Sequence, residues 1–426
     1  MKHLFQSVKI NDSTSKFHGK TVDILVSDGK IERIDKKLDA KKAEIVDCKG
    51  CTLSNGWVDL HVNFKDPGFE TAETLESGAL AAAAGGFTAV AMMPTTMPIV
   101  DSKSGIEYIK KNQVSLPVNI LPIGSLSVKR EGVDLAELFD MSKAGAVAFS
   151  DADRPITDSG LMLRALYYAK IFDGLVISNA NDPCIAANGL IHEGVVGAAL
   201  GMRTLPALAE ELMISRDISL TAYSDGKIHF TNITTAGAVN QIRKAKKDGL
   251  NVTCDVAAHH LVLSDENVMS FDSNYKVFPP LRSDDHIKAL WEGLKDGTID
   301  AISSQHTPLE QEFKAVEFEI AKAGIIGVQT LYGMLKTLAS EKFTDELIDK
   351  VLVNGPRKIL GLAPVSVEQG APADFTIYGN QDWEFNSITN LSTSKNTPLF
   401  GEKLTGNILG TYTKGMFNRN LQSQTI

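Results

Sequence analysis

Histidine and carboxylate side chains occur directly after several short apolar runs of this chain. His61 lies at the end of one run, Asp151 and Asp153 follow a second, and His306 follows a third. Imidazole nitrogen and carboxylate oxygen are the ligands that zinc takes besides thiolate, and both groups transfer protons near neutral pH. If the fold brings these side chains together, they could form a small metal site for hydrolysis.

The middle of the chain contains the elements that would position these side chains. Apolar runs alternate there with helical stretches such as Thr74–Ala84 and Pro206–Ile214, which is typical of βα units around a parallel sheet. The eight expected strands are Trp57–Phe64, Thr88–Met93, Val118–Ile123, Ala146–Ser150, Leu175–Asn179, Lys227–Thr231, Asn251–Val256 and Ile299–Ser303. Eight such units predict an α/β fold of the (β/α)8 TIM-barrel type, in which functional residues lie at the carboxyl ends of the strands.

The two ends of the chain have a different pattern. Residues 22–34 alternate in hydropathy around a Ser-Asp-Gly turn, which is a hairpin signal. Phe375–Tyr378 and the glycine-punctuated runs after it have the same character. We predict that both ends meet in one small β-sandwich domain, residues 1–52 plus 365–426, beside a barrel domain of residues 53–364.

Composition narrows the class of protein. The chain has 426 residues and a net charge of -9, which argues against nucleic acid or an anionic membrane as the main partner. It has neither an apolar run long enough to span a bilayer nor an apolar, cleavable leader at its start. We therefore expect a cytoplasmic protein that binds neither nucleic acid nor membrane.

Four cysteines occur, and two of them, Cys48 and Cys51, form a C-x-x-C. Such a pair can hold zinc or act in redox chemistry. No second pair follows at the spacing of a zinc ribbon, and no strand–CxxC–helix context surrounds it. We therefore expect two structural thiols in a turn before a strand.

The ordered polar segments resemble those of dihydroorotase, in particular the longer cyclic-amidohydrolase type that occurs with aspartate carbamoyltransferase. The resemblance extends over nearly the whole chain, so the set is more specific than any single motif. The segments that carry it are Asp59–Gly68, Met92–Pro98, Phe149–Asp153, Pro206–Glu211, Cys254–Leu261, Phe278–Ser283, Ser304–Pro308, Ser394–Pro398 and Gly401–Gly406.

This resemblance implies interconversion of carbamoyl aspartate and dihydroorotate at a zinc centre. Zinc polarises the amide carbonyl and lowers the pKa of bound water from about 15.7 to about 7. The family supplies histidine and carboxylate ligands and a further carboxylate that moves the proton.

Most of the positions that match the family's zinc ligands hold other residues here. The strand-one H-x-H is His61-Val62-Asn63, and the second carboxylate of F-S-D-D-G is Ala152. The histidines expected after strands five and six are Asn179 and Asn232. Neutral amide oxygens suit hard cations better than zinc, so we expect the zinc site to be lost and His61 to be its remnant.

The other acidic positions leave two alternatives. Asp151 keeps the first carboxylate of its motif, and Asp153 would take the ligand position if the register shifted by one residue. Gln305 replaces the catalytic aspartate of T-D-H-A-P, and an amide cannot accept a proton near neutral pH. Asp151 and Asp153 thus remain possible residual ligands, whereas Gln305 cannot be a general base.

Three positions of the family's substrate pocket also differ. Lys65 replaces the arginine that grips the substrate carboxylate, and it keeps the charge but not the planar fork. Thr95 replaces the asparagine of M-P-N-T, and Phe278 places an apolar ring where an amide is expected. Recognition of dihydroorotate is therefore in doubt independently of the metal.

The remaining motif histidines have a simpler interpretation. His259-His260 keeps a pair that occurs in the family, while His229 and His306 follow other strands. A buried histidine is more often hydrogen-bonded within the structure than bound to a metal. We expect structural roles for all four.

Our main hypothesis is a dihydroorotase-like protein without catalysis or cofactor. By resemblance to inactive members of the family, it would serve as a scaffold or partner of aspartate carbamoyltransferase, and we expect a homo-oligomer. The alternative is an active cyclic amidohydrolase with an altered or single zinc at His61, Asp151, Asp153 and His306. A third hypothesis is a sensor that binds an anionic metabolite through Lys65.

Overall fold

The computed structural model describes residues 2–40 and 42–420, and a barrel of eight parallel strands forms its centre. Neighbours in the barrel follow the order of the chain, from β6 to β15. A parallel bridge between Val62 and His306 joins the first strand to the segment after the last. The barrel strands are β6 (Trp57–Val62), β7 (Phe87–Met92), β8 (Asn119–Gly124), β9 (Ala148–Phe149), β10 (Val176–Ser178), β13 (Ile228–Phe230), β14 (Val252–Ala257) and β15 (Ala301–Ser303).

Burial on both faces explains why these strands are apolar runs rather than alternating ones. All six residues of β7 are buried. Its Ala89 and Ala91 join one hydrophobic cluster, whereas Val90 and Met92 join a second cluster that includes helix residues such as Ile106. The strand therefore packs against other strands on one face and against helices on the other.

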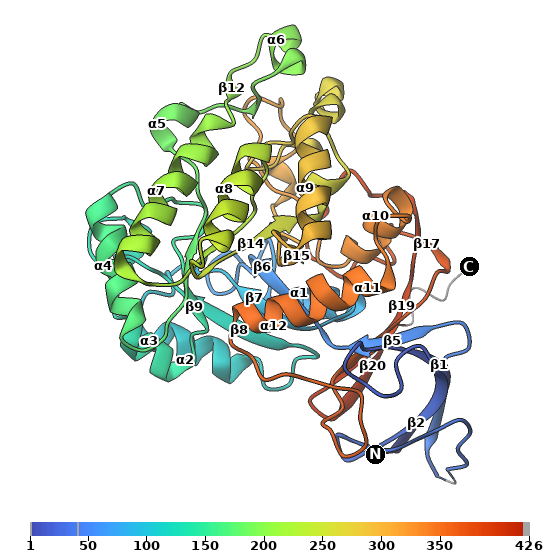
Figure 1. Cartoon of the computed structure of the whole chain (residues 1–426). Coiled ribbons are helices and arrows are strands. Elements are labelled where there is room, and N and C mark those ends of the chain that lie inside the picture. The colour runs from blue at the N-terminus through green and yellow to red at the C-terminus, as the bar shows by residue number, and fades with distance from the viewer. Residues whose placement is uncertain (1, 41, 421–426) are drawn as a thin grey trace.

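Helices cover the outside of the barrel (Figure 1). Thr74 caps the first of them by accepting a hydrogen bond from the backbone of Ser77, within a capping box. The helix expected at Pro206–Ile214 begins at Leu208 and continues to Ser224, because no glycine or proline ends it earlier. The α-helices are α1 (Leu75–Ala84), α2 (Lys103–Asn112), α3 (Leu138–Ala144), α4 (Ser159–Lys170), α5 (Pro183–Ala186), α6 (Val195–Leu200), α7 (Leu208–Ser224), α8 (Ala236–Lys247), α9 (Asp284–Asp296), α10 (Leu331–Leu338), α11 (Asp345–Ile348) and α12 (Gly355–Ile359).

Strands from both chain ends form a second sheet, and in Figure 1 the blue and red strands lie together beside the barrel. The junction is the antiparallel pairing of β5 with β16, with Leu53 opposite Ile377. Phe5, Phe375 and Tyr412 pack in the core of this sheet. Its strands are β1 (Lys2–Asn11), β2 (Thr21–Ser27), β3 (Lys30–Asp35), β4 (Glu44–Asp47), β5 (Thr52–Asn55), β16 (Phe375–Tyr378), β19 (Ile408–Thr413) and β20 (Met416–Arg419). The predicted fold class, a TIM barrel with a small β-sandwich domain from both ends, is confirmed, and the strands of the small domain form one eight-stranded sheet.

The predicted domain boundaries stay a prediction, and two features of the structure bear on where they lie. Strand β5 continues to Asn55, three residues beyond the boundary predicted at residue 52. The hairpin of β17 (Asp382–Glu384) and β18 (Lys403–Thr405) sends Trp383 and Leu404 into the barrel's cluster. The carboxy-terminal segment therefore contributes to both cores. One further pair, β11 (Ile191–His192) with β12 (Thr204–Leu205), lies between α5 and α7.

Candidate functional site

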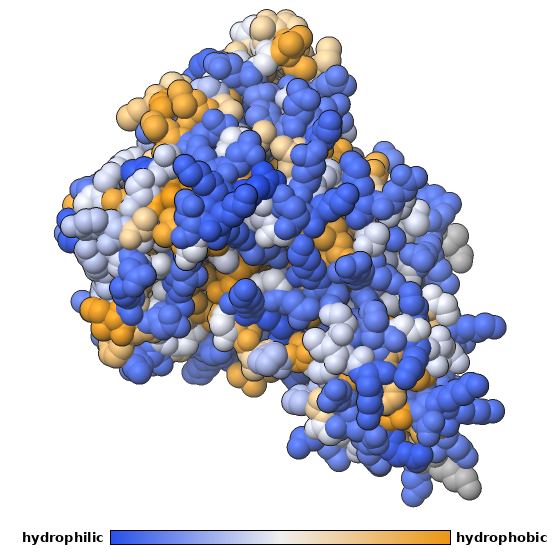
Figure 2. All heavy atoms as spheres, in the orientation of Figure 1, coloured by the Kyte–Doolittle hydropathy of each residue, from blue (hydrophilic) through white to orange (hydrophobic). Residues whose placement is uncertain are grey.

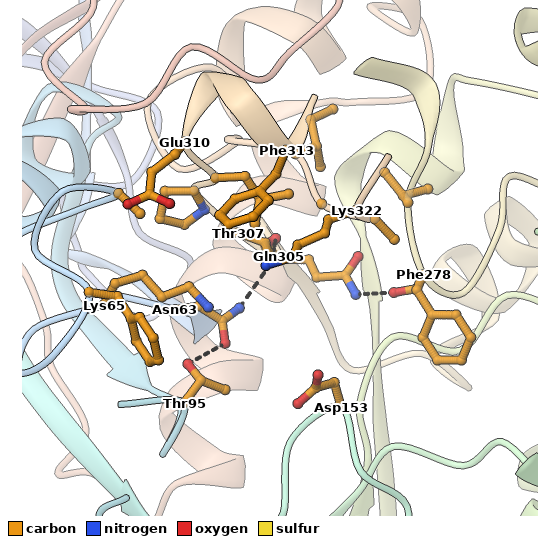
Figure 3. A pocket seen from close by; sticks show the side chains of 18 of the residues that line it. Asn63, Lys65, Thr95, Asp153, Phe278, Gln305, Thr307, Glu310, Phe313 and Lys322 are labelled. Carbon is orange, nitrogen blue, oxygen red and sulfur yellow. Dashed lines mark hydrogen bonds between the residues drawn. The ribbon is translucent and has the colours of Figure 1, made fainter. Parts of the chain in front are cut away.

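A pocket of about 560 Å³ lies at the carboxyl ends of the barrel strands, the place where this fold carries its functional groups. Phe69, Phe313 and Lys322, which the sequence analysis did not single out, also line it. Figure 3 shows Phe313 and Lys322 at its wall. The predicted site residues that line it are His61, Asn63, Lys65, Thr95, Asp153, Asn179, Phe278 and Gln305. The fold therefore brings together most of the positions predicted from the sequence.

His61, the imidazole that remains at a zinc-ligand position, is hydrogen-bonded to neutral groups. Its Nδ1 lies 3.0 Å from the carboxamide nitrogen of Asn232 and 3.1 Å from the hydroxyl of Thr231. Because Nδ1 accepts the amide N–H of Asn232, the ring proton is on Nε2. Burial lowers the pKa of His61 to about 4, so the ring is neutral at pH 7. In this arrangement neither nitrogen offers a free lone pair to a metal.

Asn63, at the second place of the H-x-H pattern, is bound to other pocket residues. Its Nδ2 donates to the carbonyl of His306 at 3.1 Å and to the hydroxyl of Thr307 at 3.0 Å. Its Oδ1 accepts from the hydroxyl of Thr95 at 3.0 Å (Figure 3). The positions predicted to hold metal and to recognise substrate thus satisfy each other's hydrogen-bonding groups.

Gln305, at the position of the catalytic aspartate, donates from Nε2 to the carbonyl of Phe278 at 2.7 Å. The ring of Phe278 packs against a small cluster of Ala186, Leu205 and Ala209. Figure 3 shows that the carbonyl of Phe278 points to Gln305 while the ring points away. The ring of Phe278 therefore turns towards this apolar cluster. Its backbone carbonyl faces Gln305 instead.

Asp151 serves the backbone rather than the pocket. Its Oδ1 accepts from the backbone amides of Leu126 and Ser127, each at 2.9 Å, and from the hydroxyl of Ser125 at 2.9 Å. The hydroxyl of Ser127 donates to Oδ2. This buried carboxylate therefore fixes the loop after β8. Ala152 follows with a positive φ of 52° and is buried.

Asp153 lines the pocket, but its charge is already paired. Arg130, which the sequence analysis missed, forms an ion pair with Asp153 and donates from Nε to the carbonyl of Asp151 at 2.9 Å. The side chain of Arg130 is buried, whereas that of Asp153 is 71% exposed. No motif marks this arginine in the sequence, because it lies 23 residues away from its partner.

Two other motif histidines are each paired with a buried carboxylate. Nε2 of His229 lies 2.8 Å from Asp255, and Nε2 of His306 lies 3.2 Å from Glu73. Burial acts to raise the pKa of both carboxyls, but the hydrogen bonds and the fields of their histidine partners bring each pKa below its ordinary value. The first contact joins the neighbouring strands β13 and β14, and the second joins the segment after β15 to the loop before α1. The four groups proposed for a single-metal site, His61, Asp151, Asp153 and His306, are therefore engaged with different partners.

The His259-His260 pair is buried, with its ring centroids 4.4 Å apart. Burial lowers the pKa of His259 to about 3 and that of His260 well below its usual value. Both rings are therefore neutral at pH 7. Within the described residues, Nε2 of His259 and both ring nitrogens of His260 have no hydrogen-bond partner, so the pair is buried without most of the hydrogen bonds expected for it.

The residues present do not fit a catalytic zinc. No group of three histidine, cysteine, aspartate or glutamate side chains lies close enough to hold a metal ion anywhere in residues 2–40 and 42–420. The pocket offers the amides of Asn63, Asn179 and Gln305 instead, and these neutral oxygens are poor zinc ligands. In the same described ranges, no helix is both long and apolar enough to cross a membrane.

Comparison with known proteins places this geometry in a family. A family model described as "Dihydro-orotase-like" matches residues 50–237. A protein of Pelotomaculum thermopropionicum named dihydroorotase is 41% identical over 388 residues, which is 90% of this chain and 91% of that protein. A protein of Syntrophus aciditrophicus with the same name is 39% identical over 421 residues, 97% of this chain and 98% of that one.

Solved structures show the same architecture at lower identity. An L-hydantoinase (dihydropyrimidinase) from Arthrobacter aurescens superposes with a TM-score of 0.86 at 23% identity and covers 99% of this chain and 97% of its own. A D-hydantoinase superposes with a TM-score of 0.83, also at 23% identity, over 99% of this chain and 96% of its own. At this identity the likeness shows the fold.

Proposed function

The chain belongs to the dihydroorotase family, and from that premise we propose that it is a non-catalytic member that serves pyrimidine biosynthesis as a scaffold or partner of aspartate carbamoyltransferase. One observation carries the loss of catalysis. Asn63, Asn232 and Gln305 stand where two zinc ligands and the catalytic carboxylate are expected, and each is used in a hydrogen bond within the pocket.

The chemistry of these groups supports the proposal. Hydrolysis of a cyclic amide needs an activated water and a group that takes its proton. The pKa of unactivated water is about 15.7, and the amide of Gln305 cannot accept a proton near pH 7. His61 is neutral, but its Nδ1 is occupied by Asn232. The pocket thus lacks both parts of the mechanism that the family's motifs imply.

Two measurements on the purified protein test the loss of catalysis. We expect zinc well below one equivalent by elemental analysis, and no ring opening of dihydroorotate or ring closing of carbamoyl aspartate above background. The Syntrophus aciditrophicus relative, prepared and assayed in the same way, is the positive control. Stoichiometric zinc together with turnover would overturn the proposal.

The contacts that build the barrel support the scaffold role. They are present although the residues at the family's zinc-ligand positions have changed. The barrel closes through Val62 and His306, and Asp151 still fixes the loop after β8. A protein left without any role would be expected to lose such contacts, so their presence supports a role that depends on the fold. We expect the host's aspartate carbamoyltransferase to co-sediment with this protein, and two independent sedimentation profiles at micromolar concentration would contradict the role.

Exposed apolar side chains on α6 and α7 are one candidate contact for the proposed homo-oligomer. Val195 of α6 and Leu208 and Leu212 of α7 are exposed apolar side chains. Figure 2 shows apolar surface at the tip formed by α6 and near α5. Sedimentation of the protein alone gives its oligomeric state, and Leu208→Glu with Leu212→Glu should shift it towards monomer if this surface is the contact.

A further inference from the structure

We propose that an exposed apolar patch ringed by glutamates is a docking surface for a partner protein segment that carries apolar side chains between lysines or arginines. This rim patch consists of Met269, Phe271, Val316 and Ile320. None of these four described residues lines the barrel-mouth pocket, so the surface is independent of whether that pocket is catalytic. It extends the proposed scaffold role by specifying the chemistry that a partner must present.

The rim patch is built from two segments that pack together. One half lies at the end of the 3₁₀ helix η3 (Asp265–Ser270), and the other half follows the 3₁₀ helix η5 (Gln311–Phe313). Nζ of the buried Lys276 joins the two segments, because it donates to the carbonyls of Phe318 at 2.7 Å and Glu319 at 2.9 Å. The four apolar side chains therefore belong to one region of the surface.

All four apolar side chains of the rim patch are exposed to solvent. The exposed fractions are 57% for Met269, 50% for Phe271, 39% for Val316 and 71% for Ile320. Single exposed apolar residues are ordinary, whereas a group of large ones rimmed by polar residues marks an interaction site. Methionine and phenylalanine are also enriched where proteins meet. The rim patch thus has the composition of a protein contact.

Phe271 occupies this surface in an unfavourable backbone conformation. Its φ is 55°, in the left-handed region that bulky residues rarely adopt and that asparagine tolerates better. Its ring meets Phe318 edge to face, with the centroids 6.4 Å apart, but half of the side chain stays exposed. The stability of the isolated protein does not account for a phenylalanine here, whereas burial of its ring by a partner does.

Carboxylates surround the apolar side chains. Within residues 265–276 and 311–322, the exposed charged side chains are one lysine, Lys322, and the four glutamates Glu266, Glu312, Glu317 and Glu319. Glu319 is paired with Arg203 at 3.3 Å. The other three carboxylates have no hydrogen-bond or ion-pair partner in residues 2–40 and 42–420. Because complementary charges steer association and fix the register of a contact, these carboxylates favour a basic partner.

The same charges argue against a second copy of this chain as the occupant. A symmetric contact between two copies places the same patch on both sides, so the glutamates of one copy would face those of the other. Like charges that meet across an interface disfavour association, and the net charge of -9 adds repulsion at longer range. A basic segment of another protein gains from both terms.

The segment that carries Val316 and Ile320 is held in place by a second buried lysine. Nζ of Lys314 donates to the carbonyls of Lys276 at 3.3 Å, of Lys322 at 3.1 Å and of Gly324 at 3.1 Å. Bonds from one ammonium group therefore tie both ends of the segment to its neighbour. An ordered surface loses less conformational entropy when a partner binds.

Three labelled helical peptides of one pattern test the chemistry of the partner. One consists of leucine and lysine, one of leucine and glutamate, and one of alanine and lysine, and fluorescence anisotropy measures their binding to the full chain. We expect the leucine–lysine peptide to bind about tenfold or more tightly than either of the others. If it does not bind, or if either of the others binds equally well, the proposal is overturned.

Apolar variants test where the leucine–lysine peptide binds. Phe271→Ser with Ile320→Ser should weaken it by about fivefold or more. Val114→Ser with Ile388→Ser removes two exposed apolar side chains elsewhere, and this control should bind like the parent. Ile320→Ser alone keeps the test valid if the change at Phe271 disturbs folding, because Ile320 is the most exposed of the four. Parent affinity in the folded patch variants overturns the assignment of the surface.

Charge variants test the ring of glutamates. Glu312→Gln with Glu317→Gln keeps the shape of both side chains, and it should weaken the leucine–lysine peptide by about threefold or more and reduce the salt dependence of binding. Glu341→Gln with Glu346→Gln, also exposed, is the control and should keep the parent's salt dependence. The same salt dependence in both variants overturns the basic partner. Neither zinc content nor turnover enters these measurements, so their failure leaves the proposed loss of catalysis unaffected.

Discussion

Asn232 donates its carboxamide N–H to Nδ1 of His61 across 3.0 Å, so a residue at one former ligand position occupies the imidazole at another. The same amide accepts from the hydroxyl of Ser303 at 3.3 Å, and the backbone of Asn232 donates to Asp255 at 3.0 Å. The backbone φ of Asn232 is 55°, a left-handed conformation that asparagine tolerates better than most residues. The residue is therefore adapted to this place as a structural link between strands.

Replacing this link should destabilise the protein. Asn232→Ala leaves the buried Ser303 hydroxyl and His61 Nδ1 with fewer partners and puts alanine at a positive φ, so we expect a loss of about 1–3 kcal/mol in the free energy of unfolding. Urea denaturation at pH 7 measures it. Asn179→Ala is the matched control, because Asn179 has no hydrogen-bond partner among the described residues, and it should cost clearly less. Equal losses would mean that the Asn232–His61 link contributes nothing.

A buried carboxyl next to this site should make stability depend on pH. Burial raises the pKa of Asp59 to about 7, and the negative charge of Asp255 acts in the same direction, although the backbone amides of His61 and Ser304 donate to Asp59. The folded state therefore binds a proton between about pH 4 and 7 that the unfolded state has released, so this group's contribution falls as pH rises through that window. A pKa that differs by one between the folded and unfolded states corresponds to about 1.4 kcal/mol, which makes roughly 4 kcal/mol an upper figure for the whole window.

Asp59→Asn removes the ionisation while keeping an oxygen for both amide donors. We expect the variant to lose the downward slope of the unfolding free energy between pH 5 and 7, measured by urea denaturation at several pH values. Asp39→Asn, in an exposed loop, is the control and should keep the parent slope. If the parent and Asp59→Asn give parallel curves, Asp59 does not titrate in this window.

The fold was largely predictable because its elements carry local signals. The strands are buried on both faces, so apolar runs such as Phe87–Met92 mark them without any partner information. That the chain ends meet was also predictable from their β character. The register between β5 and β16 was not predictable. Leu53 pairs with Ile377 across more than 300 residues, and no local sequence pattern indicates which residues of two such distant strands pair.

The contacts that individual polar side chains make were less predictable from the sequence. The sequence shows Asp151 just after a strand, but a carboxylate there looks the same whether it faces the pocket or accepts from Leu126 and Ser127 on the neighbouring loop. The direction of the Phe278 ring depends on the apolar cluster behind it. Lys322 lies in a segment without periodicity, so its place at the pocket rim came only from the packing of that segment.

The C-x-x-C pair should behave as two inert thiols. Cys48 is buried and Cys51 is partly buried, and burial raises the pKa of both, which lowers the fraction of reactive thiolate. Cys254 is also buried, whereas Cys184 is exposed. With a chromogenic thiol reagent at pH 8 we expect one fast equivalent, lost in Cys184→Ser, and four equivalents after unfolding. A fast phase that persists in Cys184→Ser would indicate an accessible C-x-x-C.

Returning a carboxylate to the family's catalytic position should harm the protein rather than revive it. Gln305 donates to the carbonyl of Phe278 at 2.7 Å, and Gln305→Asp replaces this donor with a negative group that faces a carbonyl oxygen. Aspartate tolerates the positive φ of 48° found there, so the backbone is not the obstacle. Because a partly buried acceptor loses its donor and faces a negative charge instead, we expect a loss of about 1–2 kcal/mol in the free energy of unfolding at pH 7. Gln305→Asn has the length of aspartate but keeps an N–H donor, so the difference between the two variants isolates the charge. Dihydroorotate turnover should stay at background in both, since the ligands for a metal are still absent, and turnover in Gln305→Asp alone would show that one substitution had silenced an otherwise competent site.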